Sequence, residues 1–273
     1  MINSNGLTIV TGIKRSGTSA VMSALRESGI PVAGFKWPER IDSPYGESQD
    51  GGLSSPWKSD TRGAKHNPTG YWELISVIRG GLKPEHAGLD GEVVKVLVRD
   101  LPKSFPDLIK RVIFVMRNPL CVLRSRITCG EIDEGDTDKL RLHALTYINN
   151  ITVCWKWLRD HLRPVKLVIY EELVNDPEKV MLDVCGWMMR GSPLWGAKVI
   201  EKSWNRSDPI KIEYKIAKEL SDFYQLFVDR NFEEVYKRDL TESRAQLDKL
   251  YKRMLDRQNP QQNPKKEVAG CRK

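Results

Sequence analysis

Apolar residues form four short, nearly continuous runs along the first two thirds of the chain. These runs cover residues 7–11, 93–98, 112–116 and 166–170. Continuous runs, rather than alternating ones, are typical of strands that are buried on both faces, as in a parallel sheet covered by helices. The pattern therefore predicts four buried parallel strands.

Between and after these runs, apolar residues recur with the period of a helix. The clearest helical stretch covers residues 137–162, and a second begins with Asp176 as N-cap and Pro177 at the first helical position. Strands that alternate with helices predict an α/β fold with a doubly wound, mostly parallel sheet and helices on both faces. Two further amphipathic stretches, one from Ile212 to Val235 and one from Leu247 to Met254, predict a helical C-terminal part.

Length and composition favour one large domain. With 273 residues, 40% of them hydrophobic, the chain can bury a single α/β core, and we expect this domain to cover residues 1–257. Residues 34–91 are rich in Gly, Pro and Ser and show no period, so we expect a long mobile insertion that is either a lid over the site or a disordered segment. Residues 258–273 cannot bury a core and are expected to form a disordered basic tail.

The net charge of +8 has two sources. Residues 257–273 hold five Lys or Arg and one Glu, so this tail carries half of the excess. The remaining charge is modest, and neither a dense basic helix nor a zinc-binding spacing supports a nucleic-acid partner. With no apolar run long enough to span a bilayer, no signal-peptide pattern and five cysteines without paired spacing, we expect a cytoplasmic protein with no membrane span.

The first apolar run leads into a turn with the spacing of a phosphate-binding loop. From Gly12 to Gly17 the spacing is that of G-x-x-x-x-G-K-[ST]. Backbone N–H groups at such a turn and at the following helix start point at one place, where the helix dipole also favours an anion. Thr18 stands where nucleoside-triphosphate hydrolases have Lys, and the cations Lys14 and Arg15 lie inside the turn instead. The loop thus predicts a phosphate-bearing ligand other than ordinary ATP.

Together with later segments, this loop resembles the sulfotransferase family that uses 3′-phosphoadenosine 5′-phosphosulfate (PAPS), in particular its bacterial-type members. In chain order, the segments that carry the resemblance are residues 12–19, residues 67–73 (Asn-Pro-Thr-Gly-Tyr-Trp-Glu), residues 112–119 with Ser125 eight residues after Arg117, and residues 168–177. The resemblance spans roughly residues 7–207. It implies a P-loop NTPase-like sulfotransferase fold and transfer of a sulfuryl group from PAPS to a hydroxyl or amine, which releases 3′-phosphoadenosine 5′-phosphate (PAP).

The resemblance also implies roles for particular residues. Those expected to bind PAPS are Lys14, Arg15, Ser16, Gly17, Thr18, Ser19, Arg117, Ser125 and Arg206. Lys14 is in addition expected to be catalytic, because its ammonium would meet the charge that grows on the leaving phosphate. Arg117 and Ser125 are expected to share the 3′-phosphate. No metal is required, because PAPS has no triphosphate to neutralise.

The resemblance does not single out one residue as the general base. Glu73 is the first candidate, since it follows Tyr71 and Trp72, which would partly desolvate its carboxylate. A helix-capping role for Glu73 is the alternative, and His66 is the competing base. The acceptor is expected to be a small molecule or a glycan. Two other functions stay open: a P-loop kinase acting on a nucleotide or small molecule, and a PAP-binding module without catalysis.

Overall fold

A computed structural model describes residues 6–33, 35–36, 72–77, 80–89, 92–201 and 208–258. The predicted tail beyond Gln258 and most of the predicted insertion lie outside these residues, so no lid or disorder is assigned to them. His66 and Arg206 lie outside them as well.

The core of the fold is a five-stranded parallel sheet with the order β2-β5-β1-β6-β7. Its strands are β1 (Leu7–Gly12), β2 (Val32–Ala33), β5 (Val93–Lys95), β6 (Ile109–Met116) and β7 (Val165–Ile169). Every pairing in this sheet is parallel, so the predicted doubly wound, mostly parallel α/β sheet is confirmed. All four predicted strands are present, although β5 ends at Lys95. Beside the sheet, β3 (Phe35–Lys36) pairs antiparallel with β4 (Trp72–Glu73).

Both faces of the sheet are buried, which explains the continuous apolar runs. On β6, Val112 and Phe114 face a core that includes helix α4 (Thr137–Asp160), whereas Ile113 and Val115 face a second core that includes helix α1 (Thr18–Glu27). Since neighbouring side chains of a strand point to opposite faces, a strand covered on both sides must be apolar at every position.

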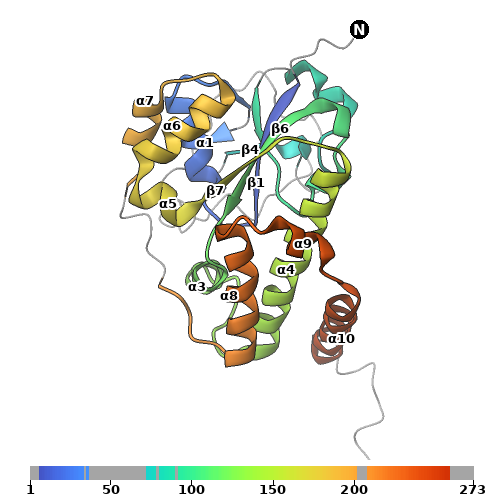
Figure 1. Cartoon of the computed structure of the whole chain (residues 1–273). Coiled ribbons are helices and arrows are strands. Elements are labelled where there is room, and N and C mark those ends of the chain that lie inside the picture. Colours follow the sequence, from blue (N-terminus) through green and yellow to red (C-terminus); the bar gives the residue numbers. More distant parts are fainter. Residues whose placement is uncertain are drawn as a thin grey trace, which may run out of the picture.

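The helices divide between the two cores (Figure 1). The helices that contribute to the core with α1 (Thr18–Glu27) are α5 (Tyr170–Asn175), α6 (Pro177–Met188) and α7 (Pro193–Lys198). The core on the opposite face includes residues of α3 (Pro119–Thr128), α4 (Thr137–Asp160), α8 (Tyr214–Val228) and α9 (Phe232–Lys237). Short 3-10 helices η2 (Ile75–Val77), η3 (Pro84–Leu89), η4 (Leu101–Lys103) and η5 (Pro106–Leu108) fill the connections.

Local signals in the sequence fix several helix ends. Asp176 caps α6, because its side chain accepts a hydrogen bond from the N–H of Lys179, and Asp136 caps α4 in the same way. The predicted helix over residues 137–162 is therefore confirmed as α4. The C-terminal part is helical as predicted, but Val235 lies on α9 rather than on α8. The final helix, α10 (Thr241–Gln258), packs Leu247 and Leu250 against α4.

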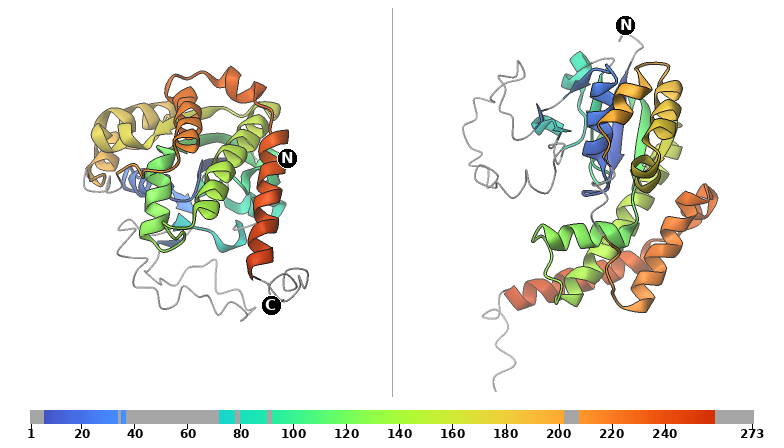
Figure 2. Two further views of the ribbon diagram at one scale, coloured as in Figure 1. Left: turned by 90° about the horizontal axis from the view of Figure 1, so that it is seen from below. Right: turned by 90° about the vertical axis from the view of Figure 1, so that its left-hand side faces the viewer.

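Strand order determines where a ligand can bind. The chain runs from β1 out to β2, returns to β5, and then crosses to the other side of β1 to form β6 and β7. A parallel sheet binds ligands at the carboxyl ends of its strands, where the strand order reverses. Figures 1 and 2 show α3, α8 and the first part of α4 beyond this end of the sheet. The loop that follows β1 thus lies at the reversal point.

Candidate functional site

The loop between β1 and α1 has the tight turn that its sequence predicts. Arg15 and Gly17 both have positive φ, at 77° and 93°. A Cβ atom on Gly12 would lie 2.5 Å from Oγ of Ser16, so this position also requires glycine. Gly17 is the N-cap of α1, and no side chain hydrogen-bonds there. The first N–H groups of α1 thus lack a side-chain cap, as at helix starts that bind phosphate.

Three of the predicted PAPS-binding residues meet beside this loop, although they come from distant segments. Nε of Arg15 donates a hydrogen bond to Oγ of Ser125 at 3.0 Å, across 110 residues of chain. Nη1 of Arg117 donates to the carbonyl oxygen of Arg15 at 3.1 Å. The contacts follow from the sheet, because β1 and β6 are neighbours and both carboxyl ends lie at the same edge.

Several buried polar atoms beside the loop lack a partner within the described part of the chain. They are Nε and Nη2 of Arg117, Oγ of Ser16 and Oγ1 of Thr11. The side chain of Arg117 is almost fully buried, with 5% exposure. Buried donors without acceptors are costly, and an anion such as phosphate would accept from the Arg117 and Ser16 donors. The residues present therefore fit a phosphate-bearing ligand.

The ring of Tyr170 packs against the loop at Gly17, a contact that the sequence alone does not reveal. A Cβ atom on Gly17 would lie 2.1 Å from the ring of Tyr170, so the absence of a side chain allows this contact. The guanidinium carbon of Arg117 lies 4.6 Å from the centre of the same ring. Tyr170 thus fixes both the loop and the plane of Arg117.

Glu171, next in the chain, has a structural role. Its carboxylate accepts from the N–H of Asn118 at 2.9 Å and from the hydroxyl of Tyr224 at 2.8 Å. These bonds hold the start of α3 in place, next to Arg117. Burial, with Glu171 adding to it, raises the pKa of the Tyr224 hydroxyl, which keeps it a hydrogen-bond donor.

Lys14 contacts a carboxylate that the sequence did not single out. Its Nζ lies 3.0 Å from Oε1 of Glu131, which follows α3, and the two side chains are 38% and 27% exposed. Lys95, at the end of β5, donates from Nζ to Oγ of Ser19 at 3.3 Å. Thr18 and Ser19 themselves are buried at the start of α1. Cations from two neighbouring strand ends therefore face the same loop.

Arg126 and His143 form a second group next to Lys14 and Glu131. Nη1 of Arg126 lies 2.7 Å from Nδ1 of His143. Burial, together with the charge of the nearby Arg126, lowers the pKa of His143 to about 4. His143 is therefore neutral near pH 7, and its Nδ1 can accept from Arg126.

The predicted bases are not placed by the structure. The backbone of Glu73 lies on β4, opposite Phe35 of β3. Its side chain lies outside the described residues, as do His66 and Arg206. The roles of Glu73, His66 and Arg206 stay predictions.

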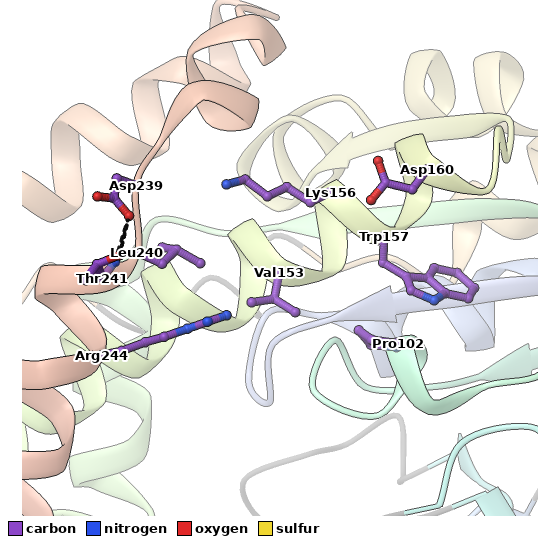
Figure 3. Close-up of a pocket in the computed structure, with 9 residues that line it drawn as sticks. All are labelled: Pro102, Val153, Lys156, Trp157, Asp160, Asp239, Leu240, Thr241 and Arg244. Carbon is purple, nitrogen blue, oxygen red and sulfur yellow. Dashed lines mark hydrogen bonds between the residues drawn. The ribbon is translucent and has the colours of Figure 1, made fainter.

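A pocket of about 350 Å³ lies elsewhere, between α4 and the start of α10 (Figure 3). Its lining includes Trp157, Lys156 and Arg244, and no residue predicted to bind PAPS. Nζ of Lys156 donates to the carbonyl oxygen of Arg238 at 2.8 Å, so its charge serves to hold the segment before α10.

The described ranges contain no group of three or more His, Cys, Asp or Glu side chains arranged to hold a metal ion. Nor do they contain a helix with the length and apolar character that a membrane crossing needs.

Comparison with known proteins gives matches in structure only. No protein-family model matches the chain, and no curated protein sequence matches it. Among solved structures, the chain is similar to sulfotransferase STF9 from Mycobacterium avium, with 14% identity, a TM-score of 0.44, and coverage of 83% of this chain and 77% of that one. It is also similar to the sulfotransferase domain of the olefin synthase from Synechococcus PCC 7002, with 14% identity, a TM-score of 0.41, and coverage of 82% and 95%.

Proposed function

We propose that the protein is a sulfotransferase that moves a sulfuryl group from PAPS to a hydroxyl or amine of an acceptor. The observation that carries the proposal is the meeting of Arg15, Ser125 and Arg117 at the loop that begins at Gly12. The sequence motifs assign these three residues to one nucleotide, and their contacts are consistent with that assignment.

Two anion-binding positions fit the two phosphate ends of PAPS. The loop after β1, with the uncapped start of α1, suits the 5′-phosphosulfate. The buried donors of Arg117, together with Ser125, suit the 3′-phosphate. ATP has no 3′-phosphate and would leave the donors of Arg117 without acceptors, which favours PAPS over ATP.

When bound, PAPS supplies an electron-poor sulfuryl group attached to a good leaving phosphate. The protein's part is to hold that phosphate, to stabilise its growing negative charge and to orient the acceptor. Lys14 is the proposed source of this stabilisation, since the residue belongs to the loop and carries an ammonium group. For this role the Lys14 ammonium must exchange its contact with Glu131 for one with the leaving phosphate.

The acceptor must also lose a proton to a base. We propose Glu73 for this role on the sequence resemblance, with His66 as the competitor. Lys14→Ala should lower turnover by about 100-fold or more, while PAP affinity falls only modestly, because the charge that Lys14 meets is larger in the transition state. Glu73→Gln should slow turnover and leave PAP affinity nearly intact.

The experiment that tests the donor is parallel calorimetric titration with PAP, ATP and GTP. Preferential binding of PAP supports the proposal, and preferential binding of ATP or GTP would favour a kinase. Transfer of labelled sulfate from PAPS to a panel of glycans, phenols and peptides then separates an enzyme from a module that only binds PAP.

A further inference from the structure

Arg126 lies on α3 directly after Ser125, yet it belongs to a different environment. Ser125 contacts Arg15, whereas Nη1 of Arg126 lies 2.7 Å from Nδ1 of His143 on α4. Nε of Arg126 is buried and has no acceptor among the residues that the structure describes. A buried guanidinium is normally paired with a carboxylate, because removing its charge from water is costly.

His143 cannot supply the missing negative charge. It is neutral near pH 7, because burial, together with the charge of Arg126, lowers its pKa to about 4. Burial also lowers the pKa of Arg126 itself, and the cations Arg15 and Arg99 add to this effect, while Glu131 opposes it. The pair of Arg126 and His143 therefore carries one positive charge that is partly removed from water.

The charged groups around this pair are mostly cations. Lys139 lies near His143 on the same helix and is paired with Asp136 at 3.8 Å. Arg99, after β5, is paired with Asp100 at 3.2 Å. Glu131 is already 3.0 Å from Lys14. The carboxylates near Arg126 are thus engaged with other cations, and the local field stays positive.

Position links this charge to the reaction. The N–H of Glu131 donates to the carbonyl oxygen of Arg126 at 2.9 Å, and the side chain of Glu131 contacts Lys14. Glu131 also acts on the pKa of Arg126, and Glu131 and Lys14 both act on the pKa of His143, so the pair of Arg126 and His143 lies near the Lys14 side chain that is proposed to serve the sulfuryl transfer. It is also distinct from the group of Arg15, Ser125 and Arg117, which the two phosphate ends of PAPS would use.

We propose that Arg126, assisted by Arg99, binds an anionic group of the acceptor. The acceptor class is then a hydroxyl compound that carries a carboxylate or a similar anion. An anion held at Arg126 would orient the acceptor hydroxyl toward the sulfur atom of the sulfuryl group, and would give the buried Nε–H the acceptor that it lacks. This inference rests on the proposed sulfuryl transfer.

The test uses the full chain saturated with PAP, so that the phosphate positions are filled. Binding of two acids, D-glucuronate and 4-hydroxybenzoate, is compared by calorimetry with binding of their neutral partners, D-glucose and phenol. We expect at least one acid to bind about 10-fold or more tightly than its partner, the scale of one charge-assisted hydrogen bond. Which acid binds identifies the acceptor as a sugar or a phenol, and either result supports the site.

Variants assign the preference to Arg126. Arg126→Gln should abolish the preference for the acid and leave PAP affinity within about twofold of wild type. Arg124→Gln is the matched control: Arg124 lies on the same helix and is paired with Glu134 at 3.1 Å. It should keep the preference. Arg126→Lys retains the charge and should keep part of it, and thermal unfolding of each variant reports whether it folds.

The outcomes separate this inference from the proposed function. Equal binding of acid and neutral partners to the PAP complex would overturn the anion site alone. Loss of PAP affinity in Arg126→Gln as large as the loss of acid affinity would assign Arg126 to the nucleotide and also overturn it. Failure of the wild-type protein to bind PAP would overturn the proposed function, while acid binding to the nucleotide-free protein would still test Arg126.

Discussion

Arg117 is the residue whose substitution tests the proposed nucleotide site most directly. Its guanidinium is buried over the ring of Tyr170, and Nη1 donates to the carbonyl oxygen of Arg15. Nε and Nη2 have no acceptor in the described part of the chain. Arg117→Met removes every N–H donor and leaves an apolar chain to cover the ring, so it isolates the proposed contact with the 3′-phosphate.

The expected loss of PAP affinity follows from the donors that are removed. A hydrogen bond to a charged group contributes about 1.5–3 kcal/mol. Since the donors of Arg117 are already desolvated, we take the upper part of this range, about 2–3 kcal/mol, which corresponds to PAP binding about 30- to 150-fold weaker. Adenosine 5′-monophosphate lacks the 3′-phosphate, so its affinity should change by less than about threefold.

The free energy of unfolding should respond much less than the affinity. Loss of the cation–π contact with Tyr170 and of the hydrogen bond to the carbonyl oxygen of Arg15 costs about 2 kcal/mol, but removal of two buried donors without acceptors offsets a similar amount. Urea unfolding of ligand-free Arg117→Met should therefore lie within about 1 kcal/mol of wild type.

Calorimetry with both nucleotides decides the matter. A selective loss of PAP affinity is the expected result. Equal losses for PAP and adenosine 5′-monophosphate would show that the substitution damages the loop rather than a 3′-phosphate contact. Unchanged affinity for PAP would refute the assignment of Arg117 altogether.

Three further predictions test the loop and its surroundings. Gly17→Ala should lower the free energy of unfolding by about 2–3 kcal/mol or more, because its Cβ would lie 2.1 Å from an aromatic ring. Gly29→Ala is the control: it is also at positive φ but has nothing within 4 Å, so it should cost only about 1 kcal/mol. Equal losses in urea unfolding would contradict the contact of Gly17 with the ring. Glu131→Gln removes the carboxylate beside Lys14, so the affinity for PAP, measured by calorimetry, should rise about two- to fivefold at low salt and less at high salt. A fall in affinity would show instead that Glu131 positions Lys14 for binding. The pKa of His143 is lowered from 6.5 to about 4, so the unfolded state binds a proton first as pH falls. The free energy of unfolding of the wild type should therefore fall by about 1–2 kcal/mol between pH 6.5 and 4, after allowance for partial exposure. Denaturant unfolding of His143→Gln should lack this loss.

The sequence predicted the elements of the fold well wherever a local pattern was present. The apolar runs predicted β1, β5, β6 and β7, and the capping residue Asp176 predicted the start of α6. The strand β2 (Val32–Ala33) was missed, because two residues are too few to form a pattern. Val235 was assigned to the wrong helix, because the apolar spacing continues across the break between α8 and α9.

The sequence by itself determined the tight loop between β1 and α1, since two glycines at fixed spacing between a strand and a helix constrain the backbone locally. Only the tertiary structure decided which side chains complete the site. Strand order makes β1 and β6 neighbours, which brings Arg15 to Ser125, and the packing of α3 and α4 brings Arg126 to His143. Contacts of this kind depend on how distant segments pack, so a local sequence pattern does not predict which residue lies opposite on another strand or helix.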